Sequence, residues 1–173
     1  MKLEIGRICA KYTVRAFKEE DIPDIFALCL SNPNYYHHMN MRPTPENVNE
    51  VFTALPDGKT MEDKYFLGFY RENRLVAILD LITCYPDKDT AFIGWFMVDK
   101  KFQKKGVGTE IMTSLLAFLE KEDFRFVRLA YVEGNGESES FWRKNRFSPT
   151  GVRLKKEGYT AVVMQRELVP VKR

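Results

Sequence analysis

The chain has 173 residues, of which 45% are hydrophobic and 29% are charged, a balance typical of a globular domain with a sizeable core. Its 27 lysines and arginines exceed its 24 aspartates and glutamates by so little that the net charge of +3 does not predict a nucleic-acid-binding protein. Three scattered cysteines without a CxxC pair indicate neither a disulfide framework nor a zinc site, and no metal is expected. Because no apolar run reaches membrane length and MKLEIGRICAKY lacks a signal-peptide core, we expect a soluble cytoplasmic protein without a membrane partner.

The N-terminal part of the chain alternates between strand and helix signals. Residues 12–17 (YTVRAF) predict a first strand, and Asp21 is expected to cap the helix that follows. The polar, proline-punctuated stretch 31–45 (SNPNYYHHMNMRPTP) predicts a long loop, where binding residues tend to collect. Thr44 is expected to cap a second helix that begins at Pro45.

Three strands are predicted in the middle of the chain. Residues 64–70 and 74–85 are rich in aromatic and branched side chains, and the short turn at Glu72 and Asn73 between them predicts an antiparallel hairpin. Residues 90–98 (TAFIGWFMV) are apolar on both faces, as expected of a strand in the interior of a sheet.

A parallel βαβ unit is predicted from residue 90 onwards. The strand 90–98 is followed by a helical pattern over 106–123 and a strand over 126–132, and such units have a right-handed crossover. A short helix over 136–144 and a closing strand over 159–168 complete the chain. With no repeat or linker, residues 1–173 are expected to form one α/β domain.

The segment KKFQKKGVG lies between the strand 90–98 and the next helix, at the carboxyl end of the strand, where open α/β sheets bind ligands. A helix N-terminus favours an anion, Gly106 and Gly108 let a phosphate approach the backbone, and Lys104 and Lys105 add positive charge. The Walker A pattern and GxGxxG are both absent, so neither a P-loop phosphotransferase nor a dinucleotide-binding fold is predicted. Taken alone, the loop favours an ordinary glycine-rich helix entry with solvated lysines over a phosphate site, and two further features reverse this preference.

Two motifs in this order resemble those of the GNAT superfamily of N-acetyltransferases. Residues 103–108 (QKKGVG) are similar to its acetyl-CoA pyrophosphate loop, Q/R-x-x-G-x-G/A. Residues 135–147 (NGESESFWRKNRF) resemble its N-x-x-A-x-x-F-Y-x-K-x-G-F segment, with Asn135, Phe141 and Phe147 in matching places. The opening YTVRAFKEEDIPDI is also similar, so the resemblance covers nearly the whole chain.

The resemblance implies an α/β (α+β) fold with a central mixed sheet of about six to seven strands, a splayed parallel pair and helices on both faces. It also implies an acyl-CoA-dependent N-acyltransferase. Acetyl-CoA is the implied cosubstrate, and a primary amine of a small molecule or peptide attacks it directly in a ternary complex. Nucleic acid is not an expected partner, and a homodimer, common in the family, stays open. The alternative is a catalytically weak GNAT-fold module that binds or senses CoA.

The same resemblance implies a set of cofactor-binding residues. The pantetheine arm enters between the splayed strands and bonds the backbone of the first, the pyrophosphate lies on the loop amides, and the short helix forms the opposite wall. The implied residues are Phe96, Met97, Val98, Gln103, Lys104, Lys105, Gly106, Val107, Gly108, Thr109, Asn135, Phe141 and Trp142. The backbone N–H of Val98 is the implied oxyanion donor.

The catalytic candidates are Tyr131, Glu133 and Asp80. Many relatives have a tyrosine as general acid where this chain has Trp142, and an indole N–H cannot serve a thiolate in the same way. Tyr131 and Glu133 alternate near the end of a predicted strand and share one face, although a solvated loop carboxylate is the somewhat better interpretation of Glu133. Asp80 interrupts an apolar strand, so it either has an internal partner or binds the acceptor.

Tyr35 and Tyr36, in the predicted loop 31–45, are candidates for binding the acceptor, with simple packing as the alternative. If Asp80 and Glu133 line the acceptor pocket, a cationic amine is favoured. The sequence leaves the acceptor open among small metabolite amines, polyamines, aminoglycosides, amino acids and protein N-termini.

Overall fold

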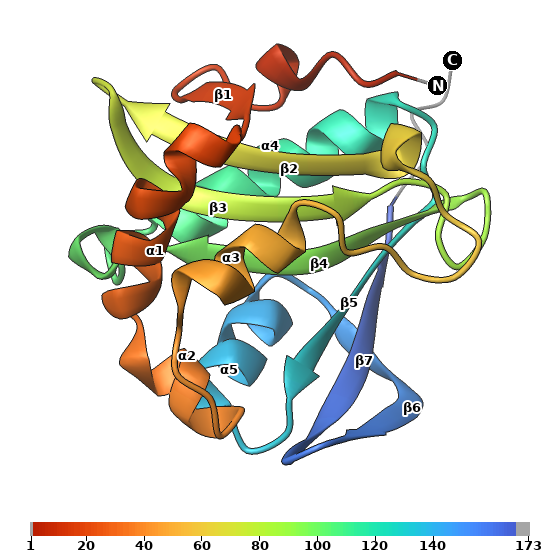
Figure 1. The fold of residues 1–173 in the computed structure, drawn as a ribbon. Helices are drawn as coiled ribbons and strands as arrows, with labels where there is room; N and C mark the ends of the chain where they lie inside the picture. The colour runs from red at the N-terminus through yellow and green to blue at the C-terminus, as the bar shows by residue number, and fades with distance from the viewer. Residues whose placement is uncertain (1, 169–173) are drawn as a thin grey trace.

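The computed structural model describes residues 2–168, which form one seven-stranded mixed sheet in the order β1-β2-β3-β4-β5-β7-β6 (Figure 1). Only β4 and β5 pair in parallel, and all other neighbours pair antiparallel. The strands are β1 (Thr13–Ala16), β2 (Lys64–Arg71), β3 (Arg74–Ile82), β4 (Thr90–Val98), β5 (Phe126–Val132), β6 (Ser148–Lys156) and β7 (Tyr159–Glu167).

Helices cover both faces of this sheet, as the resemblance implies. Figure 1 shows α1, α2 and α3 on the near face and α4 on the far face. The helices are α1 (Ile22–Leu30), α2 (Pro33–His38), α3 (Pro45–Val51), α4 (Val107–Lys121) and α5 (Gly136–Lys144).

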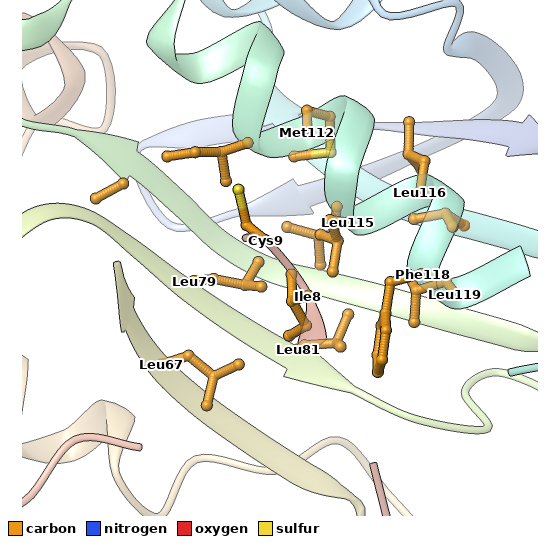
Figure 2. Close-up of a cluster of buried hydrophobic side chains, with 14 of the residues drawn as sticks. Ile8, Cys9, Leu67, Leu79, Leu81, Met112, Leu115, Leu116, Phe118 and Leu119 are labelled. Atoms are coloured by element: carbon orange, nitrogen blue, oxygen red, sulfur yellow. The ribbon is translucent and has the colours of Figure 1, made fainter. Parts of the chain in front are cut away.

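The larger apolar core lies between the sheet and α4. Figure 2 shows Met112, Leu115 and Leu119 of α4 directed toward Leu79 and Leu81 of β3. These side chains recur every three to four residues along α4, which places them on one face of the helix. Full burial of a leucine side chain contributes about 1.5–3 kcal/mol, so this packing fixes the far side of the sheet.

A smaller, more aromatic core lies on the opposite face. Ile25 and Leu28 of α1 and Val48 of α3 are buried there with Phe66 and Ile78 of the sheet. The ring of Phe66 also makes edge contacts with neighbouring aromatic rings, at centroid distances of 4.8 and 4.9 Å. The two cores hold β3 and β4 between them, which gives the functional site a rigid support.

Several predicted elements are confirmed with their bounds. The strands β4 and β5 and the helix α5 coincide with the predicted ranges. In the β2–β3 hairpin, Glu72 and Asn73 have φ values of 49° and 63°, the left-handed conformation that suits the twist of a two-residue hairpin. Thr44 caps α3 as expected, because its hydroxyl accepts from the Asn47 N–H at 3.1 Å.

Two segments differ from the prediction. The stretch predicted as a loop over 31–45 contains the six-residue helix α2, which begins at Pro33. The strand β6 was not predicted at all: almost every residue in it is exposed, so it lacks the alternation of buried and exposed side chains that identifies strands.

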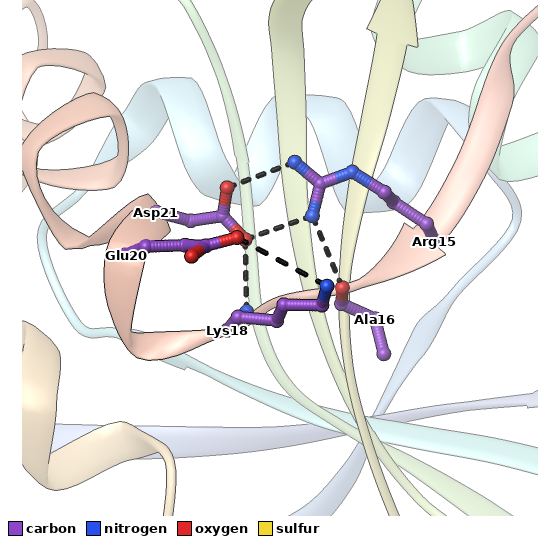
Figure 3. Close-up of polar contacts among 5 residues, drawn as sticks. All are labelled: Arg15, Ala16, Lys18, Glu20 and Asp21. Carbon is purple, nitrogen blue, oxygen red and sulfur yellow. Dashed lines mark hydrogen bonds and ion pairs between the residues drawn. The ribbon is translucent and has the colours of Figure 1, made fainter.

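The prediction for Asp21 was wrong in its detail. No side-chain bond from Asp21 caps α1. Its carboxylate instead accepts from the Lys18 backbone N–H at 2.8 Å and from both terminal nitrogens of Arg15, each at 2.8 Å (Figure 3). Asp21 therefore closes the short 3₁₀ turn that precedes α1 and links it to β1.

Within residues 2–168, none of the helices combines the length and the apolar character needed to cross a membrane.

Candidate functional site

The two parallel strands separate half-way along their length. β4 and β5 pair from Thr90 with Phe126 up to Ile93 with Leu129, and no further. Immediately after this point β4 has a bulge at Gly94. The consecutive β3 residues Asp80 and Leu81 pair with Trp95 and Ile93, so Gly94 between them has no partner on β3. A bulge bends its strand, so β4 turns away from β5 and a gap opens toward the carboxyl ends of both strands.

A cavity of about 530 Å³ occupies the mouth of this gap, a volume within the range of small-molecule sites. Its walls are β4, the loop before α4, the α1–α2 junction and α5. Eleven of the predicted cofactor residues line it: Phe96, Met97, Val98, Gln103, Lys104, Gly106, Gly108, Thr109, Asn135, Phe141 and Trp142. Of the other two, Lys105 is exposed, and Val107, the first residue of α4, is buried in the larger core.

The backbone of β4 presents polar groups to the cavity at alternate residues. The Asp99 N–H donates to the Val76 carbonyl at 2.9 Å, and the same register continues along the β3–β4 pair. In an antiparallel ladder only every second residue bonds its neighbour, so the N–H and C=O groups of Phe96 and Val98 point away from β3 and into the gap. Because β5 has left the sheet here, both groups of Phe96 and the N–H of Val98 are available to a ligand, whereas the Val98 carbonyl accepts from the side chains of Asn32 and Gln103.

The entrance of α4 has the features of an anion site. Gly106 immediately precedes the helix with a φ of 79°, a conformation that glycine adopts at little cost, and no side chain caps the N–H groups of the first turn. The lysines that line the cavity are Lys100, Lys104 and Lys144, against a single acidic residue, Glu137. Free N–H groups, the helix dipole and the lysines together favour a negatively charged ligand.

The helix α5 forms the opposite, apolar wall. Phe141 stacks on Phe96 of β4 with a centroid distance of 5.9 Å. Trp142 is buried and packs against Phe141 and Phe147 at 4.8 and 5.3 Å. Asn135 caps the helix, because its side-chain oxygen accepts from the Ser138 N–H at 3.2 Å. Trp142 is thus a packing residue in this wall.

A smaller cavity of about 50 Å³ lies deeper between the separated strands. Trp95 and Phe96 of β4, Tyr131 of β5 and Trp142 of α5 are among its lining residues. Tyr35 of α2 lines both cavities. Burial, followed by the charge of the nearby Glu139, raises the pKa of Tyr131, so its hydroxyl is protonated at neutral pH.

Tyr36, the second acceptor-binding candidate, lies elsewhere. Its side chain is buried in the smaller core with Ile25, Leu28 and Cys29. Burial, followed by a hydrogen bond with the Cys29 thiol, raises the pKa of Tyr36. Of the adjacent tyrosines, only Tyr35 borders the cavities, because neighbouring residues of a helix point in different directions.

The other two catalytic candidates are engaged in ion pairs and line neither cavity. Asp80 is buried and lies 2.7 Å from the Lys64 ammonium, so it has the internal partner that the sequence left as one of two alternatives. Burial raises the pKa of Asp80, and the charge of Lys64 opposes this effect. Glu133 is exposed and pairs with Arg153 of β6.

Several lining residues could not be recognised in the sequence. Ser31, Asn32 and Pro33 come from the α1–α2 junction, far from the glycine loop in sequence. The predicted loop 31–45 pointed to this region but not to these side chains. Among residues 2–168, no group of three or more His, Cys, Asp or Glu side chains is arranged to hold a metal ion.

A comparison with protein-family models agrees with this geometry. The model of the acetyltransferase (GNAT) family matches residues 30–147, more than half of the chain, from the end of α1 to the end of α5. The chain belongs to the GNAT family of acetyltransferases. Its classification as an acetyltransferase enzyme follows from this membership. A comparison with curated proteins gave no match.

Solved structures of other acetyltransferases have the same fold. An acetyltransferase from Thermus thermophilus has a TM-score of 0.70 at 19% identity, over 91% of this chain and 97% of that one. An acetyltransferase from Salmonella typhimurium that modifies the N-terminal serine of ribosomal protein L7/L12 has a TM-score of 0.71 at 17% identity, over 94% and 98%. The PaiA N-acetyltransferase from Thermoplasma acidophilum, in complex with coenzyme A, has a TM-score of 0.65 at 15% identity, over 90% and 98%. At these identities the likeness shows the fold alone.

Proposed function

We propose that this protein is an N-acetyltransferase that transfers the acetyl group of acetyl-CoA to a primary amine by direct attack in a ternary complex. The observation that carries the proposal is the main cavity, where a lysine-lined helix N-terminus adjoins a free backbone edge of β4. A phosphate-bearing thioester with an extended amide arm is complementary to both features.

The residues present fit acetyl-CoA in three places. The amides from Gly106 to Thr109 and the Lys104 ammonium would hold the pyrophosphate. The backbone groups of Phe96 would bond the pantetheine arm, with Phe141 packed against its opposite side. When bound, acetyl-CoA supplies an activated acetyl group with a thiolate as leaving group.

The protein must then stabilise charge and move protons. The Val98 N–H, which points into the gap, is the proposed oxyanion donor. A lysine-like acceptor has a pKa near ~10.4 and must lose a proton before it can attack. We assign proton donation to the thiolate to Tyr131, since it lines the inner cavity and a tyrosine hydroxyl is protonated at neutral pH. Glu133 and Asp80 are paired with cations, so we assign them no direct proton transfer.

The proposed acceptor is a primary amine of a small molecule or a peptide that passes Tyr35 to reach the inner cavity. One structural neighbour modifies a protein N-terminus, which is compatible with a peptide acceptor. The ion-pair partners of Asp80 and Glu133 neutralise these carboxylates, so the site does not require a cationic acceptor.

A thermal-shift comparison of acetyl-CoA, CoA, ATP and NAD tests the cosubstrate. A ligand at 100 times its dissociation constant stabilises by about 2.7 kcal/mol, which for a chain of this size raises the melting temperature by roughly 5–11 °C. We expect this shift with the two CoA species only. Gly106→Asp places a carboxylate in the anion site and should abolish the shift. Gly58→Asp is the matched control, because Gly58 has a similar φ of 78° against 79° and lies in an exposed turn outside the cavity.

An amine-dependent assay of CoA thiol release then tests the transfer. Release with at least one amine class, dependent on acetyl-CoA, supports the proposed reaction. The presence of Trp142, where many relatives have a tyrosine, favours one alternative, a module that binds or senses CoA without turnover. Binding of CoA without release from any amine would favour that module, and a shift with ATP or NAD instead of CoA would contradict both proposals.

A further inference from the structure

Two amide side chains from distant parts of the chain hold one backbone carbonyl at the edge of the main cavity. The Val98 carbonyl, at the end of β4, accepts from Asn32 Nδ2 at 3.1 Å and from Gln103 Nε2 at 2.8 Å. The Gln103 amide also donates to Asn32 Oδ1 at 2.5 Å, although these two residues are 71 positions apart. Asn32, Val98 and Gln103 thus form a closed triangle of hydrogen bonds, which we call the amide clamp.

The clamp determines which groups of β4 a ligand can use. A carbonyl oxygen has two lone pairs, and the clamp occupies both at Val98. This oxygen is therefore unavailable to a bound thioester arm. The Val98 N–H lies on the same side of the extended strand, so fixing the carbonyl also fixes the direction of this donor. Gln103 accordingly acts on the backbone, and its side chain is not free to bind a phosphate.

A second connection lies beside the clamp. The Ser31 hydroxyl accepts from the Lys100 N–H at 3.1 Å and donates to the Leu28 carbonyl at 2.7 Å. The C-terminal end of α1 is therefore bonded at two points, Lys100 and Gln103, to the loop that precedes α4. The chain continues from Asn32 directly into α2, which carries Tyr35 on the wall shared by the two cavities.

We propose that Asn32 and Gln103 are positioning residues, which orient the Val98 N–H and couple the acyl-donor loop to the acceptor-side helix α2. A ligand that orders residues 99–106 then also orders α2, so the two substrates do not bind independently. The kinetic part of this proposal rests on the proposed function. The structural part concerns only contacts within the chain.

Hydrogen exchange tests the coupling with CoA as the probe. In the wild type we expect CoA to increase protection in residues 33–39 as well as in residues 99–109. In Gln103→Met, which keeps the length of the side chain but removes the donor, the gain in residues 33–39 should be lost. Unchanged exchange of residues 33–39 in the wild type on CoA binding, or the same gain in the variant, would overturn the coupling.

Kinetics test the positioning role. We expect Gln103→Met and Asn32→Asp each to lower kcat by about 3- to 10-fold, because each removes one of the two hydrogen bonds that orient the Val98 carbonyl, and to raise KM for acetyl-CoA. Because both act through Val98, the double variant should lose little more than the worse single one. Asn49→Ala, an exposed asparagine on α3, is the control and should stay within about twofold of the wild type. A lower melting temperature with unchanged kcat and KM, or losses that multiply, would contradict the proposal.

The two proposals can fail separately. If the wild type binds no CoA species, the proposed function has failed, and the clamp is then tested by exchange without ligand. Gln103→Met should speed exchange in residues 31–38 of the free protein, while Asn49→Ala should not. Equal exchange in the wild type and Gln103→Met would overturn the clamp even then. If Gln103→Met does not fold, Asn32→Asp provides the same comparison.

Discussion

The Lys64 ammonium lies 2.7 Å from one carboxylate oxygen of Asp80, and both side chains are buried beneath the bulge of β4. Lys64 also donates to the Ala54 carbonyl at 3.0 Å, which ties the segment after α3 to the sheet. The other Asp80 oxygen lies 2.8 Å from the position that a Cβ atom on Gly94 would occupy. This ion pair therefore supports the point at which β4 separates from β5.

Removing one partner of this pair should be strongly destabilising. Asp80→Asn leaves the Lys64 charge buried without compensation, and we expect a loss of about 3–5 kcal/mol in the free energy of unfolding. Urea denaturation measures it. Arg125→Gln is the matched control, because the Arg125–Glu167 pair is 60% exposed on both sides and should contribute no more than about 1 kcal/mol. Equal losses in the two variants would show that burial of the Asp80 pair has no energetic consequence.

Gly94 should not tolerate a side chain. In Gly94→Ala the new Cβ would meet the Asp80 carboxylate at 2.8 Å, so we expect about 1–3 kcal/mol of destabilisation and weaker binding of CoA. Gly136→Ala is the control, because no atom lies within 4 Å of its Cβ position and its φ is not positive. Thermal unfolding and CoA titration of both variants make the comparison. A Gly94→Ala protein as stable as Gly136→Ala would refute the close approach.

We expect Asp21 to account for part of the stability that the protein loses at acid pH. The hydrogen bonds from Arg15 lower the pKa of Asp21 below its ordinary value of 3.8 (Figure 3). A carboxylate whose folded-state pKa is lowered stabilises the protein above its unfolded pKa and loses this contribution as the pH falls through the folded one. We therefore expect Asp21→Asn to be less stable at pH 7 and to lose less stability below pH ~4 than the wild type.

Denaturation from pH 7 to pH 2 measures this effect. Glu20→Gln is the control, since Glu20 is exposed and its nearest cation, Lys18, is 4.0 Å away. Its pH profile should follow that of the wild type. If Asp21→Asn loses as much stability as the wild type between pH 4 and pH 2, other carboxylates govern acid unfolding.

Tyr131→Phe should separate chemistry from stability. If Tyr131 donates the proton to the departing thiolate, kcat should fall by about 10²-fold, the low end for a general acid, because a thiolate leaves readily. The melting temperature should change little, since the Tyr131 side chain is only half-buried, whereas that of Tyr12 is buried. Tyr12→Phe, whose hydroxyl accepts from Arg71 at 2.9 Å away from the cavities, should show unchanged kcat and a lower melting temperature. Full activity in Tyr131→Phe would show that another group or water donates the proton to the thiolate.

Much of the fold was determined locally and could be predicted. The strands β4 and β5 and the helix α5 follow from hydrophobic periodicity and turn residues, which act over a few positions. The glycine loop after Val98 predicted the anion site, because a strand, two glycines and a helix start are consecutive in sequence. The strand β6 was not predictable, since an exposed edge strand carries no alternation of buried residues.

The roles of the polar side chains were decided only by the tertiary structure. The internal partner of Asp80 is Lys64, which is 16 positions away on a neighbouring strand, so only the pairing of the strands reveals it. Gln103 lies in the loop predicted to bind the cofactor, yet its amide holds Val98 and Asn32. A hydrogen bond depends on distance and direction in space. These are set when distant segments pack together, and no local pattern in the sequence records them.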